Sequence, residues 1–166
     1  MRWNNYASVP IMALLLLLQA SVLPHLPVLG LTPQLLLLVV ISWALLRGLE
    51  TGCVWAFVAG MFMDLFAISP LGSTSLTFMV VVLVVVVIQK ALPANLFFVP
   101  VLTGAAGTFV YLLLHFTLLR LFGFALPWTE AAALAPLIVL HGLLILPIFW
   151  ISYRLDRLAN PRRVQI

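Results

Sequence analysis

Hydrophobic residues fill six long stretches of this chain, with proline, glycine and charged residues between them. Most of these stretches approach the roughly 20 apolar residues that an α-helix needs to cross a bilayer. The pattern predicts a single all-α domain over residues 1–166, a polytopic integral membrane protein with about six transmembrane helices in one bundle. The expected spans are residues 9–23, 33–46, 51–68, 73–89, 94–122 and 131–153, with a short basic tail over residues 154–166.

Turn chemistry predicts where two of the spans begin. Thr32 is a suitable N-cap for the second span, with Pro33 at the first helical position. Residues 69–72, Ser-Pro-Leu-Gly, form the expected turn before the fourth span, and Ser73 is its expected N-cap. That span is nearly pure valine from Val80 to Val87, so we expect it at the periphery of the bundle, with a broad face toward lipid.

Two details concern the first and last spans. The first stretch is predicted to remain as a span, because Leu18 before Ala20 makes a poor signal-peptide cleavage site. In the sixth span Pro136 and Pro147 are expected kink points. Trp128 and Tyr153 suit interfacial anchors near its ends.

Composition places the chain in the integral membrane class. It is 65% hydrophobic and only 7% charged, whereas a soluble domain is about one quarter charged. The mean hydropathy is +1.27. No hydrophilic segment is long enough to fold alone, so the protein is expected to act within the bilayer, in contact with lipid, or through short loops. The net charge of +4 comes from dispersed, end-clustered basic residues, a pattern that argues against nucleic-acid binding.

The basic residues also predict the orientation. With a cytoplasmic N-terminus, six spans return the C-terminus to the cytoplasm, and only Arg120 lies on the outer side. This arrangement obeys the positive-inside rule, and the reverse one violates it. The residues then expected on the inner side are Arg2, Arg47, Lys90, Arg154, Arg157, Arg162 and Arg163.

Asp64 is the most informative polar residue, because no other charge lies between Glu50 and Lys90. A carboxylate at membrane depth costs roughly 3 kcal/mol on insertion scales and normally faces protein. Gly52, Ala56, Gly60 and Asp64 follow at a spacing of four, so a helix places them on one stripe. The stripe predicts close packing against another helix or a partner, ending in a buried polar contact.

Asp64 allows a structural and a functional interpretation. The carboxylate can lock the bundle by bonding a neighbouring helix end, such as the start of the fourth span. Alternatively it binds a ligand, relays protons or contacts a partner. His115 lies on one predicted helical face with Thr108 and Tyr111, so Asp64 and His115 are a candidate buried polar pair. His141, beside Gly142, is expected to be a hydrogen-bonded core histidine.

Enzyme signatures are mostly absent from the sequence. There is no His-Glu-x-x-His helix, no phosphate-binding glycine loop and no second intramembrane aspartate. Gly72 and Ser73 resemble a nucleophile turn only superficially, because a serine mechanism needs a base. Cys53 is expected to be a small packing residue. The sequence therefore predicts no catalytic residues, no metal site and no cofactor.

Two smaller features have ordinary structural interpretations. Residues 104–107, Gly-Ala-Ala-Gly, are expected to pack against another helix. Arg47 and Glu50 stand three residues apart at a helix turn and are predicted to form a weak pair that faces solvent or a partner.

The segment 47–72, RGLETGCVWAFVAGMFMDLFAISPLG, resembles the signature of the bacterial rod-shape-determining MreD family. That signature has a small residue, a glycine, an aspartate four residues later and a glycine after a short loop, which correspond here to Gly52, Gly60, Asp64 and Gly72. The resemblance is specific over this region and only compositional elsewhere. It implies a non-enzymatic component of the cell-elongation machinery in the cytoplasmic membrane. Its partner would be a bitopic protein, MreC, with MreB, the RodA glycosyltransferase and a class B penicillin-binding transpeptidase in the wider complex.

The sequence thus favours a membrane scaffold that docks a partner's transmembrane or juxtamembrane segment. The alternative is a vitamin-binding substrate subunit of an energy-coupling-factor transporter, because the family's architecture is similar to those subunits. Such a protein needs an outward-facing pocket with several polar groups, and few polar residues are available to line one. An intramembrane hydrolase is a third and weaker possibility.

Overall fold

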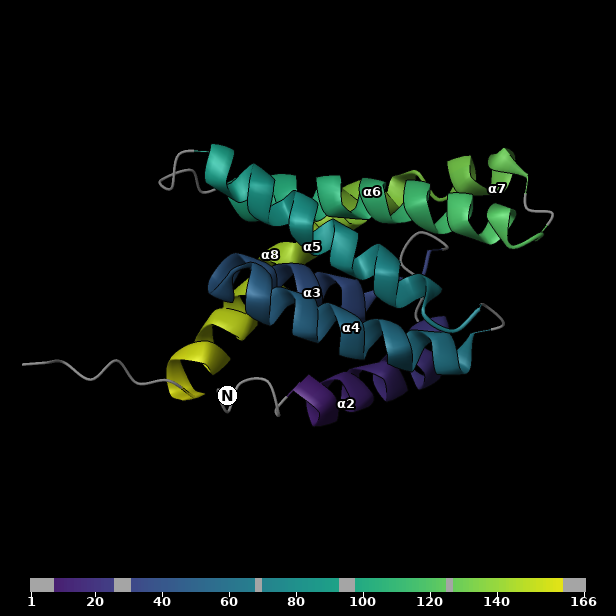
Figure 1. The fold of residues 1–166 in the computed structure, drawn as a ribbon. Coiled ribbons are helices and arrows are strands. Elements are labelled where there is room, and N and C mark those ends of the chain that lie inside the picture. Colours follow the sequence, from purple (N-terminus) through teal and green to yellow (C-terminus); the bar gives the residue numbers. More distant parts are fainter. Residues whose placement is uncertain (1–7, 26–30, 68–69, 93–97, 125–126, 160–166) are drawn as a thin grey trace, which may run out of the picture.

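The computed structural model describes residues 8–25, 31–67, 70–92, 98–124 and 127–159, and its elements are helices packed lengthwise into one bundle (Figure 1). Five helices are long and apolar enough to cross a membrane, which confirms the polytopic bundle. The elements are α2 (Ser8–Ser21), the short 3-10 turn η1 (Leu23–His25), α3 (Leu35–Arg47), α4 (Leu49–Phe66), α5 (Ser73–Ala91), α6 (Val99–Leu121), α7 (Trp128–Ala133) and α8 (Pro136–Ala159).

Helix α3 is the core of the bundle. Every residue from Leu36 to Leu45 is buried, and the helix contacts α2, α4, α5, α6 and α8. A helix that is apolar all round suits this position, because each of its faces meets another helix. Its 13 residues extend only about 20 Å at 1.5 Å per residue, less than the hydrocarbon core of about 30 Å.

The predicted start of α3 is wrong. Thr32 and Pro33 precede the helix, which begins at Leu35 after Gln34, and Gln34 makes no side-chain capping bond. The backbone N–H of Gln34 donates instead to Nε2 of His141, at 3.0 Å. A tertiary contact to α8 therefore satisfies the group that a local cap was expected to satisfy.

Helix α5 is less peripheral than its valine-rich sequence predicts. Val81, Val82, Val85 and Val86 are buried, and α5 contacts α3, α4 and α6. Only the opposite face, including Leu83, is exposed. Valines that look equivalent in sequence divide into a buried and an exposed half, because the helix packs along one side.

The last predicted span consists of two helices. Helix α7 ends at Ala133, and Pro136 is the first residue of α8 rather than a kink inside a longer helix. Pro is well suited to this position because its missing N–H would be unpaired there anyway. Pro147 does lie inside α8, and the helix extends beyond Tyr153 to Ala159, into the predicted tail.

All the described lysine and arginine residues except Arg120 gather at one end of the bundle. Gln89, near the end of α5, donates to the carbonyl oxygen of Leu45 at 2.9 Å, so Lys90 lies near the end of α3. Arg154 and Arg157, at the end of α8, place their guanidinium groups over the rings of Trp150 and Tyr153, at 4.5 and 5.6 Å. Arg47 is the last residue of α3 and lies at the same end, which we call the Arg47 end.

The opposite end is the Asp64 end, where α4 and α6 finish and α5 begins. Arg120 lies in the last turn of α6, so the segregation of basic residues that the sequence predicts holds for the described part of the chain. Arg2, Arg162 and Arg163 lie outside the described residues, as does Ser69.

Arg47 pairs with Asp156 of α8 rather than with Glu50. Nε of Arg47 donates a 2.6 Å hydrogen bond to Oδ1 of Asp156, and Nη2 of Arg47 contacts the same oxygen. The two side chains are 22% and 18% exposed, while Glu50 is exposed. The pair joins the end of α3 to α8. The sequence does not predict this contact, because the two residues are far apart in the chain.

A double-mutant cycle with Arg47→Met and Asp156→Asn is expected to give a coupling free energy of about 1 kcal/mol, at the upper end for exposed pairs because this pair is partly buried. The measurement is the free energy of unfolding in detergent micelles by titration with sodium dodecyl sulfate. The matched cycle with Arg47→Met and Glu50→Gln should give a coupling near zero. A larger coupling to Glu50 than to Asp156 would contradict the structure.

Candidate functional site

Asp64 lies in the last turn of α4 with only 3% of its surface exposed. Its Oδ2 atom accepts a 2.8 Å hydrogen bond from the backbone N–H of Gly72. The N–H of Thr74 lies 3.2 Å from both carboxylate oxygens, and the hydroxyl of Ser73 donates to Oδ1 at 3.5 Å. The carboxylate therefore binds the N-terminus of α5.

Asp64 takes the role that was predicted for Ser73. Gly72 occupies the N-cap position with φ +92° and makes no side-chain capping bond. A left-handed backbone conformation of this kind favours glycine, and it turns the first amides of α5 toward Asp64. An anion is stabilised at this position by the unpaired N–H groups and the positive end of the helix dipole.

The stripe on α4 packs tightly against α5. Gly52, Ala56 and Gly60 are buried. A Cβ atom built on Gly60 would lie 2.3 Å from the Cα atom of Ser75, and one on Gly52 would lie 2.9 Å from Cγ1 of Val82. The two backbones approach so closely at Gly60 that no side chain fits between them.

The interpretation of this stripe as a docking surface for a partner is therefore wrong. Its groove is filled by α5 of the same chain, with Ser75 directly against Gly60. The hydroxyl of Ser75 also donates to the carbonyl oxygen of Phe57 at 3.2 Å. The sequence alone does not say whether a helix of the same chain or of a partner packs on such a stripe. Gly52, Ala56, Gly60, Asp64 and Gly72 join α4 to the rest of the bundle.

The small residues of α6 have the packing role that was predicted for them. A Cβ atom on Gly104 would lie 2.9 Å from Cδ1 of Ile145 in α8, and one on Gly107 would lie 2.8 Å from Cδ1 of Ile41 in α3. Both approaches bring α6 close to its neighbours. Cys53 is a partly exposed free thiol that packs against the hydrophobic core.

His141 is a hydrogen-bonded core histidine, as predicted. It is fully buried, and because Nε2 accepts from the N–H of Gln34, Nδ1 carries the proton of the neutral ring. Nδ1 then donates to the hydroxyl of Thr108 at 2.9 Å, and that hydroxyl donates to the carbonyl oxygen of Gly104 at 2.7 Å. The chain of bonds joins α3, α6 and α8.

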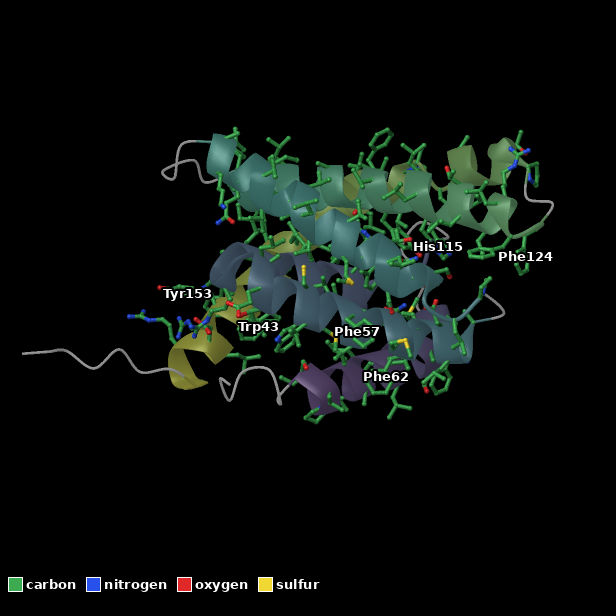
Figure 2. All side chains as sticks on the ribbon, in the orientation of Figure 1. Trp43, Phe57, Phe62, His115, Phe124 and Tyr153 are labelled. Carbon is green, nitrogen blue, oxygen red and sulfur yellow. The ribbon has the colours of Figure 1, made fainter. Side chains whose placement is uncertain are left out.

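His115 lies toward the Asp64 end (Figure 2), with its ring stacked on Tyr111 at 5.2 Å. Among the described residues, its Nδ1 atom is buried without a hydrogen-bond partner. That atom therefore makes no hydrogen bond to Asp64, although the carboxylate is close enough to act on the imidazole electrostatically. Tyr111 is buried on the same face of α6, and its hydroxyl accepts from Nε2 of Gln34 at 3.2 Å.

Gln34 was not recognised as a site residue, although it is a polar residue directly before an apolar stretch. It joins His141 through its backbone and Tyr111 through its side chain. Gln19 of α2 has a similar role, because its Nε2 contacts Sδ of Met63 at 3.6 Å. An amide inside an apolar span is the signal that points to such residues.

The described residues contain no group of three or more histidine, cysteine, aspartate or glutamate side chains that would hold a metal ion. The arrangement at the Asp64 end instead consists of a capped helix, close backbone contacts and a buried hydrogen-bond network. These features define a helical, multi-pass membrane protein whose polar groups hold the bundle together.

The comparison with protein-family models gives the particular family. The model described as rod shape-determining protein MreD matches residues 1–157, so the chain belongs to the MreD family, and it is a multi-pass membrane protein of the rod-shape system. No curated protein and no solved structure gives a significant match.

Proposed function

We propose that this chain is a non-enzymatic scaffold of the bacterial cell-elongation machinery in the cytoplasmic membrane. It binds an MreC-like bitopic protein and thereby supports peptidoglycan synthesis beside MreB, RodA and a class B penicillin-binding transpeptidase. The observation that carries the proposal is the family match over residues 1–157, which includes nearly all of the described helices. The helices are joined by short segments, so a partner's main contacts are made at membrane depth.

The proposed orientation places the Arg47 end in the cytoplasm and the Asp64 end at the outer face. The gathering of Arg47, Lys90, Arg154 and Arg157 at one end supports this orientation through the positive-inside rule. An MreC-like partner with one transmembrane helix would then meet one of the lipid-facing sides of the bundle. Apolar side chains are exposed on several of them, including Leu14 of α2, Leu113 of α6 and Leu143 of α8.

Site-specific photocrosslinking in cells tests this proposal and locates the partner surface. A benzophenone side chain is placed in turn at Leu14, Leu113 and Leu143, which are 61%, 49% and 63% exposed on three different helices. We expect a crosslink to the MreC-like protein from one of the three sides and much weaker crosslinks from the other two, because one bitopic helix covers one side.

Two results would argue against the scaffold. One is the absence of any partner crosslink from all three sides combined with a failure of the MreC-like protein to co-purify. The other is co-purification of a transporter's ATPase subunits, which would favour the energy-coupling-factor alternative. An exposed position outside the membrane-facing helix sides, Glu50, serves as the background control for the crosslinker.

A further inference from the structure

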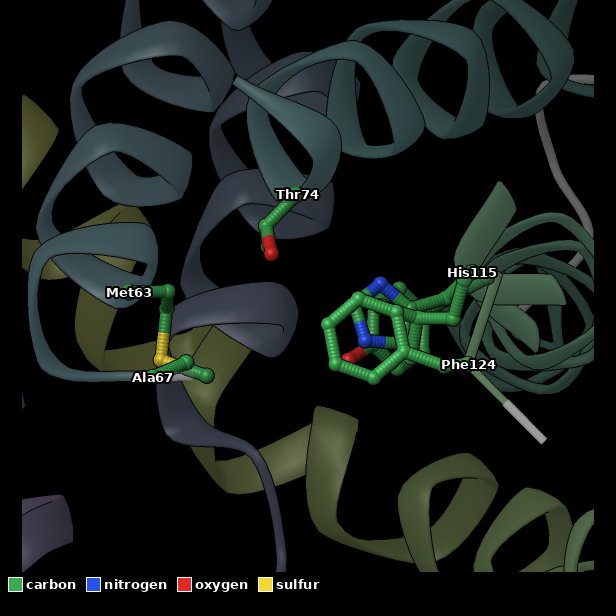
Figure 3. Close-up of a pocket in the computed structure, with 7 residues that line it drawn as sticks. Met63, Ala67, Thr74, His115 and Phe124 are labelled. Atoms are coloured by element: carbon green, nitrogen blue, oxygen red, sulfur yellow. The ribbon is translucent and has the colours of Figure 1, made fainter. Parts of the chain in front are cut away.

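A cavity of about 280 Å³ lies between α4, α5 and α6 at the Asp64 end (Figure 3). Met63 of α4 and Ala67, the residue that follows the helix, form one wall. The rings of His115 and Phe124 form the facing wall, and Thr74 of α5 points into the space between the walls. The ring of Tyr111, stacked on His115, also lines the cavity.

The short central helix explains why this space is open. Helix α3 has 13 residues and begins at Leu35, whereas α6 has 23 residues. At 1.5 Å per residue the difference is about 15 Å. Gln34, at the start of α3, bonds to Tyr111, so α3 begins near the cavity and does not extend past it to separate α4 from α6.

A buried polar atom faces this region without a partner. Among the described residues, Nδ1 of His115 is buried and unpaired, and so is Oε1 of Gln34, whose amide nitrogen donates to Tyr111. An unpaired buried group of this kind costs about 1–3 kcal/mol. A neutral imidazole offers one acceptor nitrogen, so a ligand with an N–H or O–H donor would satisfy His115.

The lining also limits the charge of a ligand. No aspartate, glutamate, lysine or arginine lines the cavity within the described part of the chain. The carboxylate of Asp64 is directed at the amides of Gly72 and Thr74. An anion would therefore lie close to the Asp64 carboxylate without a counter-charge, which is costly. A cation would lose hydration for a carboxylate that already accepts from two amides, so the cavity favours a neutral molecule.

The shape of the walls favours a flat ring. The imidazole of His115 and the phenol of Tyr111 are nearly parallel, with an interplanar angle of 19°, and Phe124 lies beside them (Figure 3). The thioether of Met63 stands opposite (Figure 3), and sulfur atoms make favourable contacts with aromatic rings. The volume of about 280 Å³ is just below the roughly 300 Å³ of the smallest typical ligand pockets, so only a small molecule fits.

We propose that this cavity binds a small, neutral, planar aromatic molecule whose N–H or O–H group donates a hydrogen bond to Nδ1 of His115. The site is separate from the lipid-facing surfaces proposed for the partner. Ligand binding would hold α4, α5 and α6 together at the Asp64 end, where Asp64 already joins α4 to α5.

The test uses 5-fluoroindole as a probe of the full chain in lipid nanodiscs, with binding followed by fluorine NMR. We expect saturable binding that unlabelled indole competes away. We also expect 5-fluoro-1-methylindole, which has nearly the same shape but lacks the N–H, to bind at least tenfold more weakly. Equal binding of the two probes, or signals that rise without saturation as in lipid partitioning, would overturn the proposal.

Paired tryptophan substitutions on α6 locate the bound probe. Leu119 lines the cavity, whereas Leu113 is 49% exposed on the same helix. Leu119→Trp fills the cavity and should abolish saturable binding, and Leu113→Trp should leave it unchanged. His115→Phe keeps a ring but removes Nδ1, and it should weaken indole binding at least tenfold. Binding that survives Leu119→Trp would overturn the proposal.

Native mass spectrometry of protein taken directly from membranes then identifies the natural occupant. A small neutral molecule should be retained by the wild type and by Leu113→Trp, and lost from Leu119→Trp. A phospholipid, or a partner's side chain crosslinked in the cavity, would contradict the proposal. Co-purification of the MreC-like protein should be the same for Leu119→Trp as for the wild type, so the scaffold proposal can fail or hold independently.

Discussion

Replacing Gly60 with alanine is expected to reduce the free energy of unfolding by at least ~3 kcal/mol. The added Cβ would lie 2.3 Å from Cα and 2.4 Å from the backbone nitrogen of Ser75. These are backbone atoms that cannot rotate away, so α4 and α5 must separate along the whole seam. Unfolding of the purified protein in detergent by titration with sodium dodecyl sulfate, followed by circular dichroism, measures the loss.

Gly142→Ala is the matched control for this substitution. Gly142 is also a buried glycine inside a membrane helix, but a Cβ there would lie no closer than 3.6 Å to any neighbour, an ordinary contact. Its stability should change by less than ~1 kcal/mol, and toward greater stability because alanine is the better helix former. Equal effects of the two substitutions would show that α4 and α5 do not approach closely at Gly60.

Asp64→Ala is expected to cost about 2 to 4 kcal/mol of unfolding free energy. The substitution leaves the buried amide of Thr74 and the partly buried amide of Gly72 without acceptors, and an unpaired buried group costs about 1–3 kcal/mol. Asp64→Asn keeps one oxygen acceptor but loses the charge at the helix N-terminus, so its cost should be nearer ~1 kcal/mol. The same detergent titration gives both values.

Glu50→Ala provides the control for removing an acid from α4. Glu50 lies in the first turn of α4 and is exposed, so its loss should change the stability by less than ~0.5 kcal/mol. Normal stability and normal cell shape with Asp64→Ala would refute any role for Asp64, both in the structure and in the function proposed for the chain.

The sequence predicts the spans and the buried carboxylate well, because both depend on local patterns. The apolar stretches and the spacing of Gly52, Gly60 and Asp64 place small residues on one face of a helix whatever lies opposite. The contact between Asp64 and the start of the fourth span is also predictable from the sequence. A short turn keeps the end of one helix near the start of the next.

The same patterns do not say which helix fills a groove. A small-residue stripe has the same sequence whether α5 or a partner packs on it, so the docking interpretation failed while the packing interpretation held. Arg47 pairs with Asp156, 109 residues away in the sequence, because α8 packs against the central helix α3. Local spacing along the sequence indicates only Glu50 as a partner for Arg47. The buried valines of α5 were missed for a similar reason, since a uniform run has no periodicity that marks the inner face.

The short α3 and the single residue, Gly48, between it and α4 have a consequence for how the protein enters the bilayer. A helix of 13 residues is too short to span the hydrocarbon core on its own, and this hydrophobic mismatch is unfavourable. We therefore expect α3 to be released from the translocon only together with α4, as a two-helix hairpin, and to reach its final depth after the later helices have surrounded it.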